Sequence, residues 1–220
     1  MGATNYGPFT YLGMMTVRKE LQRKGIGQAL LQHMLDWSAA QGISYLRLDA
    51  SDAGFPLYLR FGFEVLDQAL MFQPANYSPS SIFPQQVRPL KFQDNQVLAD
   101  FDSPIFGANR TGLFQLLLTD FPDRGFAVYN GFGGMAGYLF AQTRRLGPWA
   151  AHSPQDAAAL LRAALTLTFK GDPMAIAPAT NTAAPDLLNH YGFRHELTNR
   201  HMQRGPLTMP GRRMAIYGQT

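Results

Sequence analysis

The apolar and polar positions in the first third of the chain predict a strand, a loop, a helix and a second strand, one after another. Residues 11–17 form an apolar run of strand length, and residues 28–40 place Leu30 and Trp37 at helical spacing. Residues 44–50 form a second strand-like run. Because strands and helices alternate in this way, the sequence predicts an α/β fold with a mixed sheet.

The alternation continues through the rest of the chain. Residues 56–60 predict a short helix and residues 64–72 a strand, whereas the Pro-, Ser- and Asn-rich residues 73–86 predict a linker. Beyond the linker, the pattern predicts strands at 87–90, 125–130, 135–143, 174–178 and 194–202, and helices at 95–101, 110–119, 154–169 and 185–190.

The two halves of the chain are related by an internal repeat. Ala29-Leu30-Leu31 aligns with Ala159-Leu160-Leu161, and Gly62-Phe63 aligns with Gly192-Phe193, at one constant offset. A repeat of this length indicates a duplicated domain rather than a solenoid unit. We therefore expect a first domain at 1–72, a linker at 73–86, a second domain at 87–204 and a tail at 205–220.

A candidate phosphate-binding loop, Gln22-Arg23-Lys24-Gly25-Ile26-Gly27, precedes the first long helix. No Ser, Thr, Asp or Asn stands at the N-cap position, so the first amides of the helix lack a side-chain acceptor. The two glycines allow a ligand to approach the backbone, and Arg23 and Lys24 lie beside the positive end of the helix dipole. Such a loop suits a pyrophosphate, although a plain surface turn would have the same glycines.

Together with the segment that follows, this loop resembles the GCN5-related N-acetyltransferase (GNAT) family. The acetyl-CoA loop of that family, Q/R-x-x-G-x-G/A, is matched by Gln22, Gly25 and Gly27. Its later motif, N-x-x-A-x-x-L-Y-x-x-x-G-F, is matched at four positions and altered at two. The matches are Leu57, Tyr58, Gly62 and Phe63, and Ser51 and Gly54 replace the Asn and the Ala. The resemblance implies an acyl-CoA N-acyltransferase (GNAT) fold in two tandem copies and transfer of an acetyl group from acetyl-CoA to a primary amine.

The resemblance also assigns roles to residues of the first copy. The pyrophosphate would bind the loop, the pantetheine arm would pair with the strand-end backbone, and Tyr58 would protonate the leaving thiolate. The cofactor-binding residues would be Met15, Thr16, Val17, Gln22, Arg23, Lys24, Gly25, Ile26, Gly27 and Gln28. Tyr58 could instead be a packing tyrosine. The general base is not identified, since Glu20 and Asp49 are both near in sequence and Asp49 could equally cap a turn.

The second copy differs where the chemistry is expected. The loop is replaced by His152-Ser153-Pro154-Gln155-Asp156-Ala157, whose S-x-x-D pattern predicts a capping box that satisfies its own donors and repels a phosphate. Leu188 stands at the position of Tyr58. We expect a structural or substrate-shaping role for this copy, with a rearranged acyl-CoA site as the alternative.

The first copy is short at its N-terminal end. Val87 to Gln155 precede the loop-equivalent position in the second copy, but only Met1 to Gly25 precede it in the first. The first GNAT domain is therefore expected to lack its N-terminal half, either because this sequence does not include it or because something else completes the domain. An incomplete sheet exposes an edge, so homodimerisation, docking on the second domain or poor behaviour in isolation are expected.

Composition narrows the remaining function classes. The net charge of +4 is mild and scattered, which does not favour nucleic acid, and the absence of cysteine excludes disulfides. The apolar stretch 157–169 is too short to span a membrane, so we predict a cytoplasmic protein. The histidines lack metal-ligand spacing, so we predict that the protein binds no metal. Two alternatives to an enzyme remain: a non-catalytic CoA-binding or interaction module, and an RNA-binding role for the basic segment 204–213.

Overall fold

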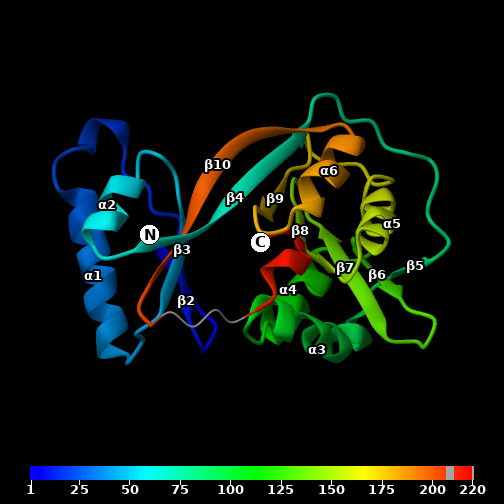
Figure 1. Ribbon diagram of the computed structural model, residues 1–220, viewed down its shortest axis with the longest axis horizontal. Coiled ribbons are helices and arrows are strands. Elements are labelled where there is room, and N and C mark those ends of the chain that lie inside the picture. Colours follow the sequence, from blue (N-terminus) through cyan, green and yellow to red (C-terminus); the bar gives the residue numbers. More distant parts are fainter. Residues whose placement is uncertain (207–210, 220) are drawn as a thin grey trace. The chain divides into compact units, whose positions relative to one another are not determined.

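The computed structural model describes residues 1–206 and 211–219, so residues 207–210 of the predicted basic tail lie outside the described part. The chain forms two compact units (Figure 1). The first contains Met1–Gln68 and the segment that starts at Asn199, and the second contains Ala69–Thr198 and the described C-terminal residues.

Two strands run from one unit into the other. Strand β4 (Glu64–Pro74) starts in the first unit and ends in the second, whereas β10 (Phe193–Arg204) starts in the second and ends in the first. The internal repeat aligns these two strands with each other. Each copy of the repeat therefore gives the end of its last strand to the unit that holds the other copy.

The sheet of the first unit contains both parallel and antiparallel pairs. Strands β1 (Gly2–Asn5) and β2 (Thr10–Gly13) form an antiparallel hairpin, and β3 (Leu46–Ala50) runs parallel to β2. The end of β10 pairs antiparallel with β3 on its other side. The predicted α/β fold with a mixed sheet is confirmed.

Two α-helices cover one face of this sheet, α1 (Ile26–Ala40) and α2 (Phe55–Arg60), and a short 3-10 helix, η1 (Lys19–Leu21), lies in the loop before α1. A shared apolar core joins helices and strands, with Leu12, Leu31, Leu35, Leu46, Leu48, Ala50, Tyr58, Phe63 and Met202 as its buried members. Because side chains alternate between the faces of a strand, Arg47 and Asp49 of β3 lie on the face opposite this core.

The second unit is built on an antiparallel sheet with the order β11-β8-β7-β6-β5. Its strands are β5 (Val87–Pro89), β6 (Gly125–Tyr129), β7 (Met135–Ala141), β8 (Leu146–Ala151) and β11 (Ile216–Gly218). The central strands are buried along nearly their whole length, because helices pack on both faces.

Four α-helices make these two layers. One layer is formed by α3 (Asn95–Phe106) and α4 (Thr111–Asp120), which share a core with residues such as Tyr138 of β7. A short 3-10 helix, η2 (Phe92–Asp94), precedes α3. The pair α5 (Pro154–Ala164) and α6 (Ala183–His190) shares another core with the neighbouring residues of the same strands. Strand β9 (Ala175–Pro178) pairs antiparallel with the end of β4, and η3 (Arg213–Ala215) precedes β11.

The predicted elements are largely present, but the apolar pattern did not predict three of the strands, β1, β8 and β11. Strand β8 contains Gly147 and Pro148, which are residues that argue against a strand, and β11 lies in the segment that was interpreted as a tail. The helix predicted at 154–169 ends at Ala164. Residues 75–86 of the predicted linker have no helix or strand, whereas residues 73–74, which were also placed in the linker, belong to β4.

Candidate active site

A pocket of about 940 Å³ lies in the first unit, where β2 and β3 stop pairing. The parallel ladder between these strands consists of Thr10 with Leu46 and Tyr11 with Arg47. Beyond it, residues from both strands line the pocket, among them Gly13 and Asp49. Most of the remaining wall comes from the segment between β2 and α1, from the start of α1, and from α2 with the turn before it, and Met1 and Asn199 of β10 also contribute.

Most of the predicted site residues meet in this pocket. Its wall contains Met15, Thr16, Val17, Gln22, Arg23, Gly25, Gly27, Gln28 and Tyr58. The two others, Lys24 and Ile26, are exposed residues of the same loop and helix start that do not line the pocket. The two sequence motifs, which are separated by a helix and a strand, therefore share one cavity.

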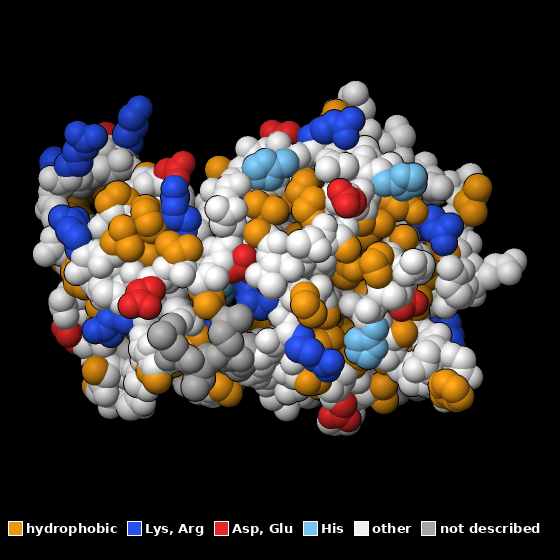
Figure 2. Space-filling view, viewed as in Figure 1, with side chains coloured by type: hydrophobic (Ala, Val, Ile, Leu, Met, Phe, Trp, Pro, Cys, Tyr) orange, Lys and Arg blue, Asp and Glu red, His pale blue; other side chains and the backbone are white. Residues whose placement is uncertain are grey.

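The start of α1 carries positive charge and has no cap. Among the described residues, no side chain caps the helix, and the N-cap residue is Gly25, whose φ of 79° lies in the left-handed region that favours glycine. A β carbon at Gly25 would meet nothing within 4 Å, so the space beside it is open. Figure 2 shows Lys and Arg side chains gathered at the end of this unit where Figure 1 places the loop before α1, a loop that carries Arg18, Lys19, Arg23 and Lys24. Free amides, the helix dipole and these cations favour an anion.

Gln22 has a structural contact that the motif alone does not reveal. Its side-chain Nε2 donates a hydrogen bond to the carbonyl of Val17 at 3.0 Å. This bond ties the beginning of the loop to the segment that follows β2. A β carbon at Gly27 would lie 3.3 Å from Cε of Met15, so α1 also packs closely against that segment.

Tyr58 of α2 lines the pocket and is buried, with an exposed fraction of 8%. Its hydroxyl donates to Sδ of Met15 at 3.4 Å, and its ring packs edge-on against Phe63. Burial raises the pKa of this phenol above its ordinary value, so it stays protonated at neutral pH. Gly54 makes room for the ring, because a β carbon there would lie 3.1 Å from Cε2 of Tyr58.

A second group of polar residues reaches the site from β3 and β10. Nδ1 of His201 lies 2.7 Å from Oδ1 of Asp49, and the two residues are directly opposite each other in the antiparallel ladder. The ring of Tyr11 stacks on His201 with centroids 6.2 Å apart. Asn199, two residues earlier on β10, also lines the pocket. The sequence placed Asp49 and Glu20 near the site without assigning a general base, and it gave no sign of His201 or Asn199, because His201 lies 152 positions from Asp49.

The equivalent helix start in the second copy is capped by its own side chains. The Oγ of Ser153 accepts a hydrogen bond from the amide of Asp156 at 3.1 Å and donates to Oδ2 of Asp156 at 2.6 Å. The predicted side-chain cap at Ser153 is present, but the carboxylate of Asp156 accepts from the Ser153 hydroxyl, where a capping box would use the Ser153 amide. Leu188, which replaces the tyrosine, is fully buried in the apolar core. This helix start therefore presents a carboxylate in place of free amides.

The C-terminal strand fills the space that corresponds to the pocket of the first copy. Arg145 and Met174, the residues just before β8 and β9, form a parallel bridge. Farther along, β11 pairs with β8, and Gln219 donates its amide to the carbonyl of Ile176 on β9. The ring of Tyr217 packs on Trp149 with centroids 5.3 Å apart. The chain's own backbone thus occupies the opening between the two strands.

Comparisons with known proteins agree with this architecture. Residues 1–74 and residues 98–218 each match a family described as an acetyltransferase (GNAT) domain, and the second match alone covers more than half of the chain. The chain therefore belongs to the GNAT acetyltransferase family, and the prediction of two tandem copies is confirmed.

Individual relatives extend over most of the chain. The uncharacterised N-acetyltransferase YitH of Bacillus subtilis is 27% identical over 201 residues, which are 89% of this chain and 70% of YitH. A crystal structure of a candidate acetyltransferase from Pyrococcus horikoshii matches 99% of this chain and 72% of its own with a TM-score of 0.83 and 22% identity. A GCN5-related N-acetyltransferase from Sphaerobacter thermophilus gives a TM-score of 0.63 at 14% identity, with 92% of this chain and 75% of its own covered.

Two features are absent from the described residues, 1–206 and 211–219. In that part of the chain, no helix is long and apolar enough to cross a membrane. The same residues contain no group of three or more His, Asp or Glu side chains that could hold a metal ion.

Proposed function

We propose that the chain is an N-acetyltransferase that moves an acetyl group from acetyl-CoA to a primary amine in the pocket of the first unit. One observation carries this proposal: the uncapped start of α1 and the buried phenol of Tyr58 line the same pocket. The first could hold the pyrophosphate of the donor, and the second could serve the departing sulfur. Residues 15–17 line the same pocket, and Met15 contacts Tyr58 and lies close to Gly27 at the start of α1, so this segment would take the pantetheine arm.

Tyr58 would act as the general acid. Its pKa is raised by burial, so the proton needed by the CoA thiolate is present at neutral pH. The hydroxyl already donates to a sulfur atom, Sδ of Met15, at 3.4 Å. A thioester sulfur in the same part of the pocket would be within reach of the same donor.

We propose one acyl-CoA site per chain, in the first copy. The cap formed by Ser153 and Asp156 and the strand β11 between β8 and β9 both oppose binding of an acyl-CoA in the second copy. These are separate obstacles, because one concerns the phosphate end of the donor and the other its pantetheine arm.

The test combines binding and turnover on the full chain. Calorimetric titration with acetyl-CoA should give one site per chain, and a panel of primary amines should reveal an acceptor. Tyr58→Phe should then lower kcat by about 10²- to 10⁴-fold while acetyl-CoA affinity changes less than about twofold. Tyr191→Phe is the matched control, since Tyr191 is a half-buried tyrosine at the end of α6 outside the pocket.

Two results would reject the proposal. Absence of acetyl-CoA binding by the folded chain would remove the site itself. Saturable binding with no turnover on any amine would favour the alternative, a CoA-binding or interaction module that does not catalyse.

A further inference from the structure

We propose that Asp49 accepts the proton of the acceptor amine, and that His201, from the last strand of the second copy, positions its carboxylate. This inference rests on the proposed acetyl transfer and adds the residue that prepares the nucleophile. It also gives the second copy a role in the site of the first.

The pocket is lined from both faces of the sheet. Leu48 and Ala50 of β3 face the core shared with α1 and α2, together with Tyr58, whereas Asp49 between them faces the opposite side. Asp49 nevertheless lines the same pocket as Tyr58 and Gly25, because the ladder between β2 and β3 has already ended. A donor held at α1 and an acceptor held at Asp49 would therefore approach each other through the gap between these strands.

The charges in the wall favour an ammonium group at Asp49. Among the residues that line the pocket, Asp49 is the one with a carboxylate side chain, whereas Arg23 and Arg60 are cationic. The phosphates of the donor would be attracted to the cationic part, and a positively charged amine to the carboxylate. The wall thus separates a place for the anionic donor from a place for the cationic acceptor.

The contacts of His201 suit a positioning role. Its side chain is only 2% exposed, whereas the side chain of Asp49 is 20% exposed, so the carboxylate can be reached and the imidazole cannot. Nδ1 holds Oδ1 of Asp49 at 2.7 Å, and Tyr11 stacks on the ring. His201 itself is absent from the pocket wall, whereas Asn199 of the same strand is part of it. Strand β10 therefore has two roles at the site: His201 holds the carboxylate of Asp49, and Asn199 contributes to the pocket wall.

The proton balance of the step is complete with these groups. The acceptor arrives as an ammonium ion and gives one proton to Asp49, directly or through a water molecule. The freed lone pair attacks the thioester carbonyl carbon, so a C–N bond forms and the C–S bond breaks. Tyr58 gives its proton to the departing sulfur and regains one from the nitrogen as the amide forms. Asp49 releases its proton to solvent.

The first test removes the carboxylate and keeps its shape. Asp49→Asn should lower kcat/KM for the best amine of the panel by about 10²- to 10⁴-fold, while the calorimetric Kd for acetyl-CoA changes less than about twofold. Asp36→Asn is the charge-matched control, because Asp36 is exposed on α1 and lies outside the pocket. Its kinetics should equal those of the wild type.

The second test separates positioning from packing at His201. In His201→Asn, an amide N–H can replace the Nδ1 donor, whereas His201→Leu has no donor. We expect His201→Leu to lose at least tenfold in kcat, with little change in acetyl-CoA affinity, and His201→Asn to recover most of that loss. Equal losses in both variants would mean that the histidine only fills space and would overturn its positioning role.

The remaining outcomes distinguish this inference from the proposed function. If the wild type acetylates an amine and Asp49→Asn does so equally well, the role of Asp49 is wrong and the proposed function stands. If the wild type binds acetyl-CoA but acetylates no amine, both are wrong. Acetyl-CoA affinity serves as the check that each variant is folded.

Discussion

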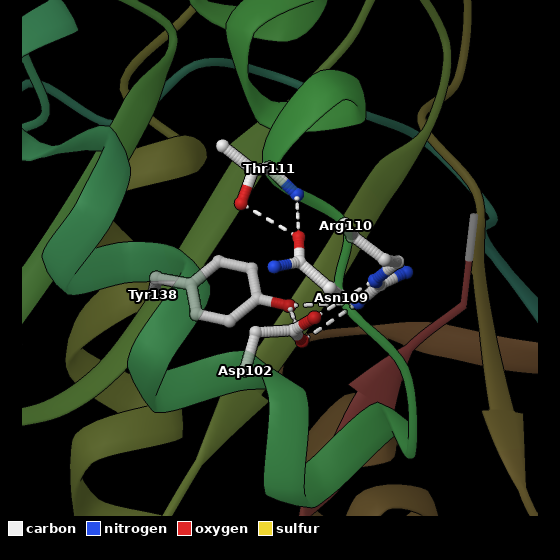
Figure 3. Close-up of polar contacts among 5 residues, drawn as sticks. All are labelled: Asp102, Asn109, Arg110, Thr111 and Tyr138. Atoms are coloured by element: carbon white, nitrogen blue, oxygen red, sulfur yellow. Dashed lines mark hydrogen bonds and ion pairs between the residues drawn. The ribbon is translucent and has the colours of Figure 1, made fainter. Parts of the chain in front are cut away.

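The buried ion pair of the second unit allows a stability prediction from its geometry (Figure 3). Asp102 of α3 accepts hydrogen bonds from Nε and Nη2 of Arg110 at 2.8 and 2.7 Å, and from the hydroxyl of Tyr138 at 2.6 Å. The side chains of Arg110 and Asp102 are only 5% and 1% exposed. The guanidinium also lies 3.8 Å from the ring centroid of Phe106. The network joins α3, the start of α4 and β7.

Arg110→Met should destabilise the second unit by about 3–5 kcal/mol, because it leaves the carboxylate of Asp102 buried without its cation. Methionine keeps part of the apolar contact with Phe106, so the loss reports mainly the charge. The hydroxyl of Tyr138 donates to Asp102 and accepts from Nη2 of Arg110 at 3.0 Å, so Tyr138→Phe should cost at least about 1.5–3 kcal/mol, the value of one hydrogen bond to a charged group. The double variant Asp102→Leu/Arg110→Met should be less destabilised than Arg110→Met, because no unpaired charge remains.

Fluorescence-detected urea unfolding can measure these costs in the second unit alone. The chain has two tryptophans, of which Trp37 is in the first unit and the fully buried Trp149 is in the second. In a Trp37→Phe background the signal comes from Trp149. Arg162→Met, at an exposed position of α5, is the control and should stay within about 0.5 kcal/mol of the parent. The reasoning would be refuted if Arg110→Met cost less than about 1 kcal/mol, or if the double variant were less stable to urea than Arg110→Met.

Three further predictions concern the helix starts and the tyrosines. Gly25→Glu should weaken acetyl-CoA binding at least tenfold by calorimetry. Gly42→Glu is its control, since Gly42 also has positive φ and open space but lies outside the pocket, and a similar loss in that variant would contradict the phosphate site. Ser153→Ala should cost the second unit about 1 kcal/mol in urea unfolding, because a helix cap is lost; an unchanged midpoint would speak against the cap. Stability should begin to fall between about pH 9 and 10 and fall further above that range, because burial raises the pKa of several tyrosines and the unfolded chain releases those protons first. Unfolding midpoints at pH 8 and 10.5 would check this, and equal values would disprove it. The tyrosines concerned are Tyr58, Tyr77, Tyr129, Tyr138 and Tyr217.

Local signals in the sequence carried most of what could be predicted. The loop before α1 was readable because its glycines and its missing cap act within a few residues of one another. The cap at Ser153 was readable for the same reason. The helices and most strands followed from apolar spacing, whereas Gly147 and Pro148 obscured β8, and β11 is only three residues long.

Strand pairing over long distances could not be read in this way. The alternating patterns of β4 and β10 would allow each strand to pair with strands of its own copy or of the other copy. Any neighbouring strand that buries the apolar face would suit such a pattern. The repeat itself favours pairing within each copy. The contact of His201 with Asp49 depends on that choice, so no local pattern around either residue could reveal it.

The exchange of strands also explains how the second copy can differ so much from the first and still contribute residues to the pocket of the first unit. The second copy contains a capped helix start and an opening that β11 fills, so its own residues can serve the fold. Through β10 it still places Asn199 in the pocket of the first unit and His201 against Asp49. Under the proposed mechanism, the functional unit is therefore not a copy of the repeat. It is the first copy together with the last strand of the second, and a change in that strand should affect catalysis even though it lies far from both sequence motifs.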